Sequence, residues 1–138
     1  MLPLPFRVGH GFDLHRLEPG YELVLGGVKL PHDVGCQAHS DGDVVLHCVV
    51  DAILGALGLP DIGQLFPDSD PRWKGQTSDV FLREAVRRMD EVGYRVGNMD
   101  VTLVSRSRGA LAALRRWGGW AHPRRLTSMH AHACLARR

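Results

Sequence analysis

An alternating stretch at residues 6–15 predicts a β-strand whose two faces differ sharply in bulk. One face carries the larger side chains, namely Phe6, Val8, His10, Phe12 and Leu14. The other face carries Arg7, two glycines, Asp13 and His15. Because Gly9 and Gly11 have no side chains, another group can approach the strand backbone closely on that face. The stretch therefore predicts a strand with one bulky side and one open side, and with two polar groups at its end.

Turn residues and hydrophobic periodicity predict the next two elements. Residues 21–30 predict a second strand, in a hairpin that turns at Gly20 and with a bulge or bend at Gly26-Gly27. Residues 44–57 form an apolar run that predicts a helix. Ser40 is its predicted N-cap, with Asp43 three residues later in an aspartate form of the capping box.

The remaining elements complete the predicted fold class. Residues 58–77 are rich in Gly, Pro and Asp and predict an ordered loop or flap. Residues 78–92 repeat apolar side chains at helical spacing, and residues 99–104 alternate as a third strand. The order strand, strand, helix, helix, strand predicts a single α+β domain, with a mixed β-sheet and helices covering one face.

Length, hydropathy and cysteine content restrict the class of protein. A chain of 138 residues can bury a core without disulfide bonds. No apolar stretch is long enough to cross a bilayer, and the start lacks the charged and apolar regions of a signal peptide. Three cysteines without a CxxC pair predict reduced thiols. We therefore expect a cytoplasmic protein that has no membrane partner.

Charge is distributed very unevenly along the chain. Residues 1–100 contain all 15 acidic side chains and nine Lys/Arg, for a net charge of −6. Residues 101–138 contain eight Arg and no Asp, Glu or Lys, for a net charge of +8. Such a split is typical of a nucleic-acid-binding tail, or of a segment that was not selected together with the rest of the chain.

Three side chains predict a catalytic metal site. Asp13 and His15 project from the same strand face, and His47 lies in the first predicted helix, on the same face as Asp43. One carboxylate and two imidazoles supply three ligands and leave one position open, as catalytic zinc requires. Asp51, one turn beyond His47, is either a residue that orients this imidazole or an ordinary polar residue of the helix surface.

A phosphate site is predicted beside the metal. His39 and Ser40 precede the helix, where free backbone N–H groups and the helix dipole favour an anion. A neighbouring metal ion would add a second positive charge, so that a phosphate group could bridge the two. The residues thus predict phosphate chemistry on a small molecule.

Four motifs in register carry a family resemblance. They read RVGHGFDLH at 7–15, AHSDGDV at 38–44 followed by Leu46 and His47, DIGQLFPDSDP at 61–71, and KG at 74–75. Together they resemble the 2-C-methyl-D-erythritol 2,4-cyclodiphosphate synthases of non-mevalonate isoprenoid biosynthesis. The similarity runs from about residue 7 to residue 104 and includes NMDVT at 98–102. We treat residues 1–104 as the synthase-like domain.

The resemblance implies an activity, a metal and an assembly. The family cyclises 4-diphosphocytidyl-2-C-methyl-D-erythritol 2-phosphate to the 2,4-cyclodiphosphate and releases CMP. It works as a homotrimer with active sites between neighbouring subunits. Zinc would be held by Asp13, His15 and His47, and His39 would help to stabilise the transition state. The implied substrate-binding residues are Asp13, His15, His39, Ser40, Asp61, Ile62, Gly63, Phe66, Pro67, Asp68, Ser69 and Asp70.

The resemblance ends after residue 104. Arg108-Gly109 stands about where the family has a Pro-Lys pair of its cytidine pocket, and residues 105–138 lack the family's Thr-Thr-x-Glu strand. That glutamate helps to hold a second ion, so its absence argues against a Mg or Mn site. Residues 110–117 predict a short helix, and no strand is predicted beyond it. We attribute this Arg-rich tail, which is not a separate domain, to a shifted reading frame near codon 105 or to true divergence.

A genuine divergent tail would weaken the enzyme, and two other functions remain open on residue chemistry alone. Such a chain would lack part of its nucleotide pocket and one sheet strand, so we expect feeble cyclase activity and poor trimerisation. The same metal ligands would serve a metal-dependent phosphohydrolase. The Arg-rich tail would suit an inactive family member that binds RNA, but it contains no recognised RNA motif, so nucleic acid is not the expected partner.

Overall fold

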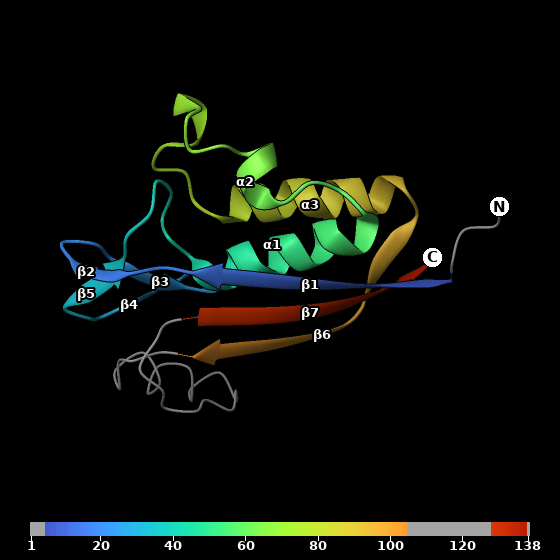
Figure 1. Ribbon diagram of the computed structural model, residues 1–138, viewed down its shortest axis with the longest axis horizontal. Helices are drawn as coiled ribbons and strands as arrows, with labels where there is room; N and C mark the ends of the chain where they lie inside the picture. The colour runs from blue at the N-terminus through green and yellow to red at the C-terminus, as the bar shows by residue number, and fades with distance from the viewer. Residues whose placement is uncertain (1–4, 105–127, 138) are drawn as a thin grey trace.

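A three-stranded antiparallel sheet forms the base of the computed structural model, which describes residues 5–104 and 128–137 (Figure 1). The strand order is β1-β7-β6. These strands are β1 (Phe6–Leu14), β6 (Tyr94–Val104) and β7 (Ser128–Arg137). A register shift between Val96 and Asn98 interrupts the pairing of β6 with β7. Strand β7 thus lies between β1 and β6 and pairs with both of them.

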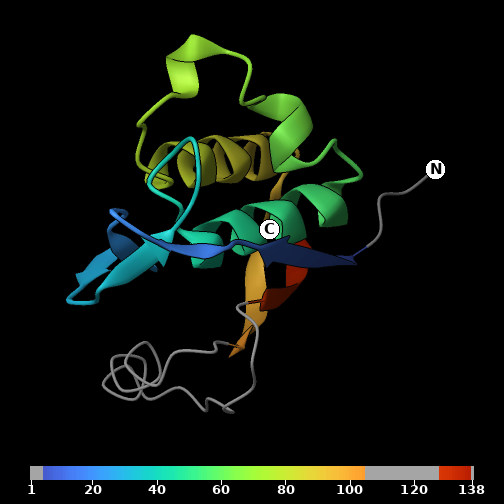
Figure 2. The same cartoon turned by 60° about the vertical axis from the view of Figure 1, so that its left-hand side comes forward.

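Helices cover only one face of this sheet. Helix α1 (Val44–Leu57) lies directly on β1 and β7, and α3 (Asp79–Glu91) packs on the far side of α1 (Figures 1 and 2). A short helix α2 (Ile62–Leu65) and a 3-10 turn, η1 (Pro71–Trp73), interrupt the predicted loop. The α+β class and the one-sided helical layer are confirmed. None of the helices in the described ranges has the length and apolarity of a membrane span.

Glycines on β1 bring α1 unusually close to the sheet. A Cβ built on Gly9 would lie 1.9 Å from the carbonyl oxygen of Ala52, and one on Gly11 would lie 2.0 Å from that of Cys48. The open face predicted for this strand is therefore filled by the backbone of α1. Most of the large side chains of the opposite face are exposed, with Val8 67% accessible.

The core lies between the sheet and α1. Ala131, Ala133 and Leu135 of β7 point toward the helices and are almost completely buried. On α1, Val44, Cys48, Val50, Ile53 and Leu54 are also inaccessible, and Phe81, Ala85 and Met89 of α3 complete the layer. Small alanines in the central strand suit this close helix, because larger side chains would force it away.

The segment at residues 17–36 forms two small ribbons instead of one strand. Strand β2 (Leu17–Pro19) pairs with β5 (Val34–Cys36), and β3 (Leu23–Leu25) pairs with β4 (Val28–Leu30). The prediction of a single strand over 21–30 is wrong, because Gly26 and Gly27 have φ angles of 61° and 79° and make a tight turn. The predicted bulge is the turn of a hairpin.

The prediction that the tail contributes no strand is also wrong. Residues 128–137 pair with β1 from Phe6 to Leu14 and with β6 from Tyr94 to Val104. Residues 131, 133 and 135 are buried at alternate positions, as expected for a strand. Two of the three are alanines, which are only weakly hydrophobic, so the alternation is hard to recognise in the sequence. The predicted helix at residues 110–117 lies outside the described residues.

The N-terminus of α1 differs from the prediction as well. Its N-cap is Asp43, whose Oδ1 accepts hydrogen bonds from the N–H groups of Val45 and Leu46 at 3.1 and 3.2 Å. Ser40 is not the cap. The Asp43 carboxylate also accepts from the N–H groups of Gly26 and Gly27, so it joins the β3-β4 turn to the helix. The N–H groups of Val45 and Leu46 are thus taken by the protein's own carboxylate, and the phosphate site at His39 and Ser40 stays a prediction.

We expect Gly9→Ala to destabilise the fold and Gly55→Ala to leave it intact. The new methyl at residue 9 would collide with backbone atoms of α1, at a cost of about 1–3 kcal/mol or more in the free energy of unfolding. A Cβ at residue 55 meets only ordinary contacts, and alanine favours a helix interior by about 0.5–1 kcal/mol. Urea denaturation of both variants measures this difference. Equal stability of the two would contradict the close approach.

Candidate metal centre

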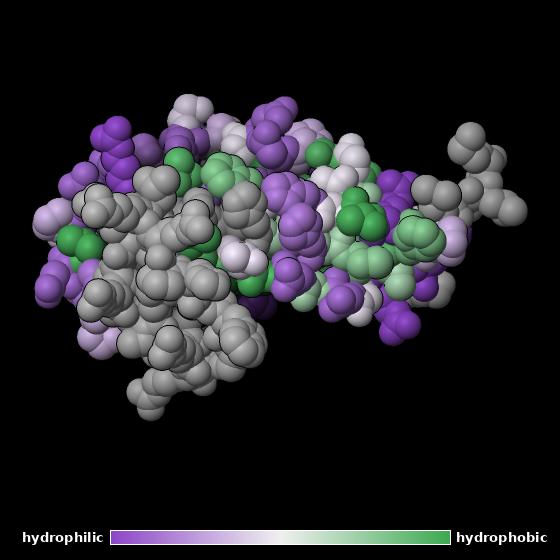
Figure 3. All heavy atoms as spheres, turned by 60° about the horizontal axis from the view of Figure 1, so that its bottom comes forward, coloured by the Kyte–Doolittle hydropathy of each residue, from purple (hydrophilic) through white to green (hydrophobic). Residues whose placement is uncertain are grey.

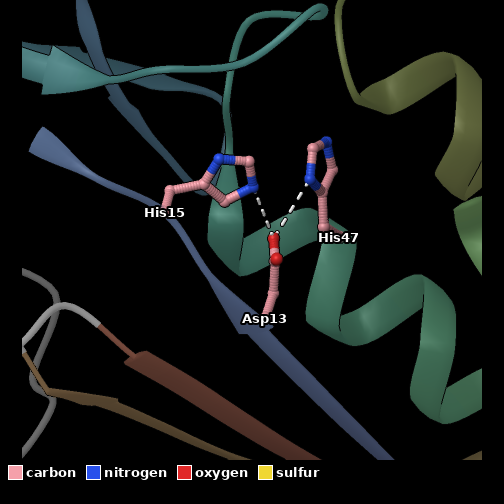
Figure 4. A group of neighbouring side chains, drawn as sticks. All are labelled: Asp13, His15 and His47. Carbon is pink, nitrogen blue, oxygen red and sulfur yellow. Dashed lines mark hydrogen bonds and ion pairs between the residues drawn. The ribbon is translucent and has the colours of Figure 1, made fainter. Parts of the chain in front are cut away.

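Asp13, His15 and His47 meet where β1 ends beside the first turn of α1 (Figure 4). The Oδ2 atom of Asp13 lies 3.0 Å from Nε2 of His15 and 3.1 Å from Nδ1 of His47. Both imidazoles point at this one carboxylate, and one ligand atom from each of the three residues lies within 4.8 Å of the others. The structure therefore brings together the three residues that were predicted as metal ligands.

The donor set fits a divalent cation such as zinc. A carboxylate oxygen can only accept hydrogen bonds, and here two ring nitrogens converge on the same oxygen. Nδ1 of His15 lies 2.9 Å from the carbonyl oxygen of Gln37, so this nitrogen donates outward and Nε2 is the nitrogen turned toward the centre, where a metal would take the place of its proton. One carboxylate with two imidazoles is the ligand chemistry of open, catalytic zinc sites.

The electrostatics of the cluster favour a charged carboxylate. Burial by itself would raise the pKa of Asp13, but hydrogen bonds and charge from His15 and His47 outweigh it and hold that pKa well below its usual range. The hydrogen bond to Asp13 raises the pKa of His15 above its ordinary value. The site thus keeps a negative charge that would attract a cation.

The outer nitrogen of His47 has partners that the sequence did not reveal. Its Nε2 lies 2.8 Å from Oγ of Ser78, at the start of α3, and 3.3 Å from Oγ of Ser40. The Asp51 carboxylate instead accepts a hydrogen bond from the N–H of Ile62 at 2.7 Å. Asp51 therefore holds the start of α2, and the interpretation that it orients His47 receives no support.

A cavity of about 710 Å³ opens beside the three residues. Eight of the predicted substrate-binding residues line it: Asp13, His15, His39, Ser40, Ile62, Gly63, Phe66 and Asp68. The other four, Asp61, Pro67, Ser69 and Asp70, are not among the lining residues. Asp61 caps α2 through the N–H of Gln64, and Asp70 caps η1 and pairs with Arg72. Both carboxylates therefore stabilise the loop without lining the cavity.

The cavity also contains residues that sequence reasoning missed. Lys74 brings a positive charge to the wall, while Tyr21, Trp73 and Phe81 bring aromatic rings. Trp73 and Phe81 pack around Phe66, with ring centroids 5.2 and 4.8 Å from it. Lys74 stood in one of the resembling motifs, and a cation near a predicted phosphate site was the available signal. No periodicity predicts the aromatic wall, because its members come from separate elements.

Comparison with known proteins places the chain in a family. The model of the YgbB family matches residues 6–112. The chain belongs to the YgbB family. An Arabidopsis thaliana relative named 2-C-methyl-D-erythritol 2,4-cyclodiphosphate synthase, chloroplastic, is 76% identical over 101 residues, or 73% of this chain and 44% of the relative. The synthase of that name from Cupriavidus metallidurans is 53% identical over 105 residues, or 76% of this chain and 62% of the relative.

Solved structures of related synthases share the fold. A structure of 2C-methyl-D-erythritol-2,4-cyclodiphosphate synthase in a CDP-bound form aligns with a TM-score of 0.76 and 37% identity, over 96% of this chain and 100% of that one. An IspF CDP complex from Plasmodium falciparum aligns with a TM-score of 0.75 and 27% identity, over 96% and 97%. The family resemblance of the sequence is confirmed. The chain spans less than half the length of the plant relatives it matches.

We expect the contribution of His15 to stability to depend on pH in the metal-free protein. Because its pKa is raised in the folded state, this contribution is fully present below the unfolded pKa of about 6.5 and is lost as the pH rises through the folded value. The free energy of unfolding of wild type should therefore exceed that of His15→Gln by more at pH 6 than at pH 9. Urea titrations with a chelator present measure both gaps, and a constant gap would contradict the coupling to Asp13.

Proposed function

We propose that this chain is a cyclodiphosphate synthase of non-mevalonate isoprenoid biosynthesis. Its substrate would be 4-diphosphocytidyl-2-C-methyl-D-erythritol 2-phosphate. The observation that carries the proposal is the meeting of Asp13, His15 and His47 in the wall of a large cavity that also contains His39 and Lys74. The names of the relatives and the CDP in the related structures support the same substrate class.

The proposed reaction closes a ring within one substrate molecule. An oxygen of the 2-phosphate attacks the β-phosphorus of the diphosphate, and a new P–O–P link forms. The bond from this phosphorus to the bridging oxygen breaks, and CMP leaves with the electron pair. Because the nucleophile is already an anion, the step needs no protein base, and positioning supplies most of the catalysis.

The main obstacle is repulsion between the two phosphates. Two unit charges about 4 Å apart repel by about 4 kcal/mol at an effective dielectric constant near 20. A divalent ion held by Asp13, His15 and His47 would supply Lewis-acid stabilisation of this charge. Lys74 adds a positive side chain to the same wall, which His39 also lines. We propose that His39 stabilises the transition state.

We propose that the loop from Asp61 to Asp70 holds the methylerythritol phosphate part of the substrate. Ile62, Gly63, Phe66 and Asp68 reach the cavity, and the capping carboxylates behind them stiffen the loop. Holding a flexible substrate in a ring-closing shape is worth roughly 7–11 kcal/mol in well-oriented intramolecular reactions. The loop is therefore proposed to provide orientation, while the metal site and Lys74 provide charge.

The residues after Val104 affect how complete this site is. The central strand of the sheet is present, so the expected loss of a strand no longer argues against activity. The family glutamate has no counterpart in residues 105–138, and we propose that a second Mg or Mn ion is bound weakly or not at all. Translating the neighbouring frames of the coding DNA around codon 105 tests the reading-frame hypothesis, which a missing Thr-Thr-x-Glu segment would refute.

We propose that the open sheet face mediates a homotrimer. Phe6, Val8, Phe12 and Leu14 of β1 are 49–67% accessible there. Several apolar side chains, coloured green, lie among polar ones on this side of the molecule (Figure 3). Exposed apolar patches of this kind mark interaction surfaces. In a homo-oligomer each copy of the chain presents the same apolar face for burial against its neighbours.

We propose a reducing compartment for this protein, with the cytoplasm as the prediction. Cys36, Cys48 and Cys134 form no disulfide bond in the described part of the chain, as is usual in such compartments. Burial raises the pKa of the Cys36 thiol to about 11, so this thiol stays protonated and resists oxidation. The plant relatives are named chloroplastic.

We expect the cyclase activity to depend on the metal ligands. The His47→Ala variant should lower kcat by at least about a hundredfold, the loss typical of removing one preorganised charge-stabilising group. His32→Ala, a histidine outside the cavity lining, is the control and should retain activity. Phosphorus NMR of the product distinguishes a cyclic diphosphate plus CMP from the linear product of a phosphohydrolase. A linear product from the wild-type chain would overturn the proposal.

We expect Val8→Lys to disrupt the homotrimer. A lysine on the open face of β1 would have to bury its charge against the neighbouring subunit. Val92→Lys is the control, because this valine is 56% exposed at the end of α3, away from that face. Light scattering after gel filtration should give three chains for wild type and the control, and one for Val8→Lys. A monomeric wild type would contradict the assembly.

A further inference from the structure

The imidazole of His47 is held at both of its nitrogens. Nδ1 faces the Asp13 carboxylate at 3.1 Å, and Nε2 faces the Ser78 hydroxyl at 2.8 Å. Ser78 itself is completely buried and its Oγ bonds to the Asp41 carboxylate, so a chain of side chains runs from Asp41 through Ser78 to the ring. Whether Nε2 donates or accepts follows from the direction of these bonds.

The Ser78 hydroxyl can give its only proton to Asp41. A carboxylate accepts and never donates, so the O–H of Ser78 must point at Oδ1 of Asp41. The backbone N–H of Ser78 bonds to the other oxygen of the same carboxylate at 3.0 Å. With its proton committed, Oγ can only accept from the imidazole, and Nε2 of His47 must be the donor.

We propose that Asp41 and Ser78 are positioning residues that fix the outer nitrogen of the His47 ring. They keep a proton on Nε2, so that Nδ1, which faces Asp13, is the nitrogen that a metal would bind in place of its proton. This inference rests on the proposed metal centre for its consequence, but the direction of the Nε2 hydrogen bond follows from contacts within the protein. Nothing in the argument requires Ser78 or Asp41 to touch the substrate.

The position of Ser78 in α3 gives independent support. Serine is favoured at an N-cap because its side chain accepts a hydrogen bond from the first turn of the helix. Ser78 occupies that position but makes no side-chain capping bond. Its oxygen faces His47 instead, while the hydroxyl of the neighbouring Thr77 bonds to Asp79. The usual structural use of the serine is replaced by the contact with the imidazole.

The other histidine of the centre is oriented in a matching way. Nδ1 of His15 donates to the carbonyl oxygen of Gln37, which leaves Nε2 free to face Asp13. Both rings therefore donate one N–H outward and turn their other nitrogen toward Asp13, where a metal would bind, as metal-binding imidazoles usually do. His15 uses a backbone carbonyl, whereas His47 uses two side chains. Only the second arrangement can be removed by substitution.

Zinc affinity of Ser78→Ala, with Thr77→Ala as control, tests the proposal. Removing an outer partner of a metal-binding imidazole usually lowers metal affinity by about 10–100-fold. We expect this loss for Ser78→Ala in a competition titration with a chromophoric chelator. Thr77→Ala should bind zinc within about threefold of wild type, because its hydroxyl faces Asp79. Melting curves of the zinc-free proteins show whether the variants remain folded. Equal affinity in folded Ser78→Ala and wild type would overturn the proposal.

NMR of the zinc-free wild type separates this inference from the proposed metal centre. Nitrogen-bound proton spectra at neutral pH show whether Nε2 of His47 carries a hydrogen-bonded proton that exchanges slowly with water. We expect this slowly exchanging proton in wild type and in Thr77→Ala, and its loss in Ser78→Ala. Its absence in wild type would overturn the inference even if zinc binds. Conversely, a wild type that binds no zinc but shows the slowly exchanging Nε2 proton would refute only the metal centre.

Discussion

The contact between α1 and β1 is the constraint on which the rest of the structure depends. Two glycines allow the helix backbone to lie against the strand, with Gly9 beside Ala52 and Gly11 beside Cys48. His47 directly precedes Cys48, and its Nδ1 therefore lies near the end of the same strand, where Asp13 projects. A bulkier strand would hold the helix farther away and separate the two groups. The chemistry of the site therefore depends on the absence of two side chains.

Carboxylates connect the elements around this contact. Asp43 caps α1 and holds the turn at Gly26 and Gly27, so the small ribbons stay fixed beside the helix. Asp41 secures the start of α3 through Ser78, and Asp51 secures the start of α2 through Ile62. Each of these carboxylates accepts hydrogen bonds from backbone N–H groups that would otherwise lack a partner inside the protein. Together they position three segments around one cavity.

Local patterns predicted some features well and others poorly. The strand at residues 6–14, the two main helices and the convergence of Asp13, His15 and His47 agree with the sequence prediction, because strict alternation and helical spacing are local signals. The strand at residues 128–137 was missed, since its buried positions are mostly alanines. Ser40 was mistaken for the helix cap because two candidate capping residues lie three positions apart, and only the backbone path chooses between them.

The sequence by itself determined the family, the helical layer and the three side chains that converge, Asp13, His15 and His47, since motifs and residue types along the chain encode them. Only the tertiary structure decided what surrounds them. The cavity wall, the cation of Lys74 and the link from Asp41 to His47 come from segments far apart in the chain. Short-range periodicity cannot indicate such neighbours, because they come into contact only when the helices pack on the sheet.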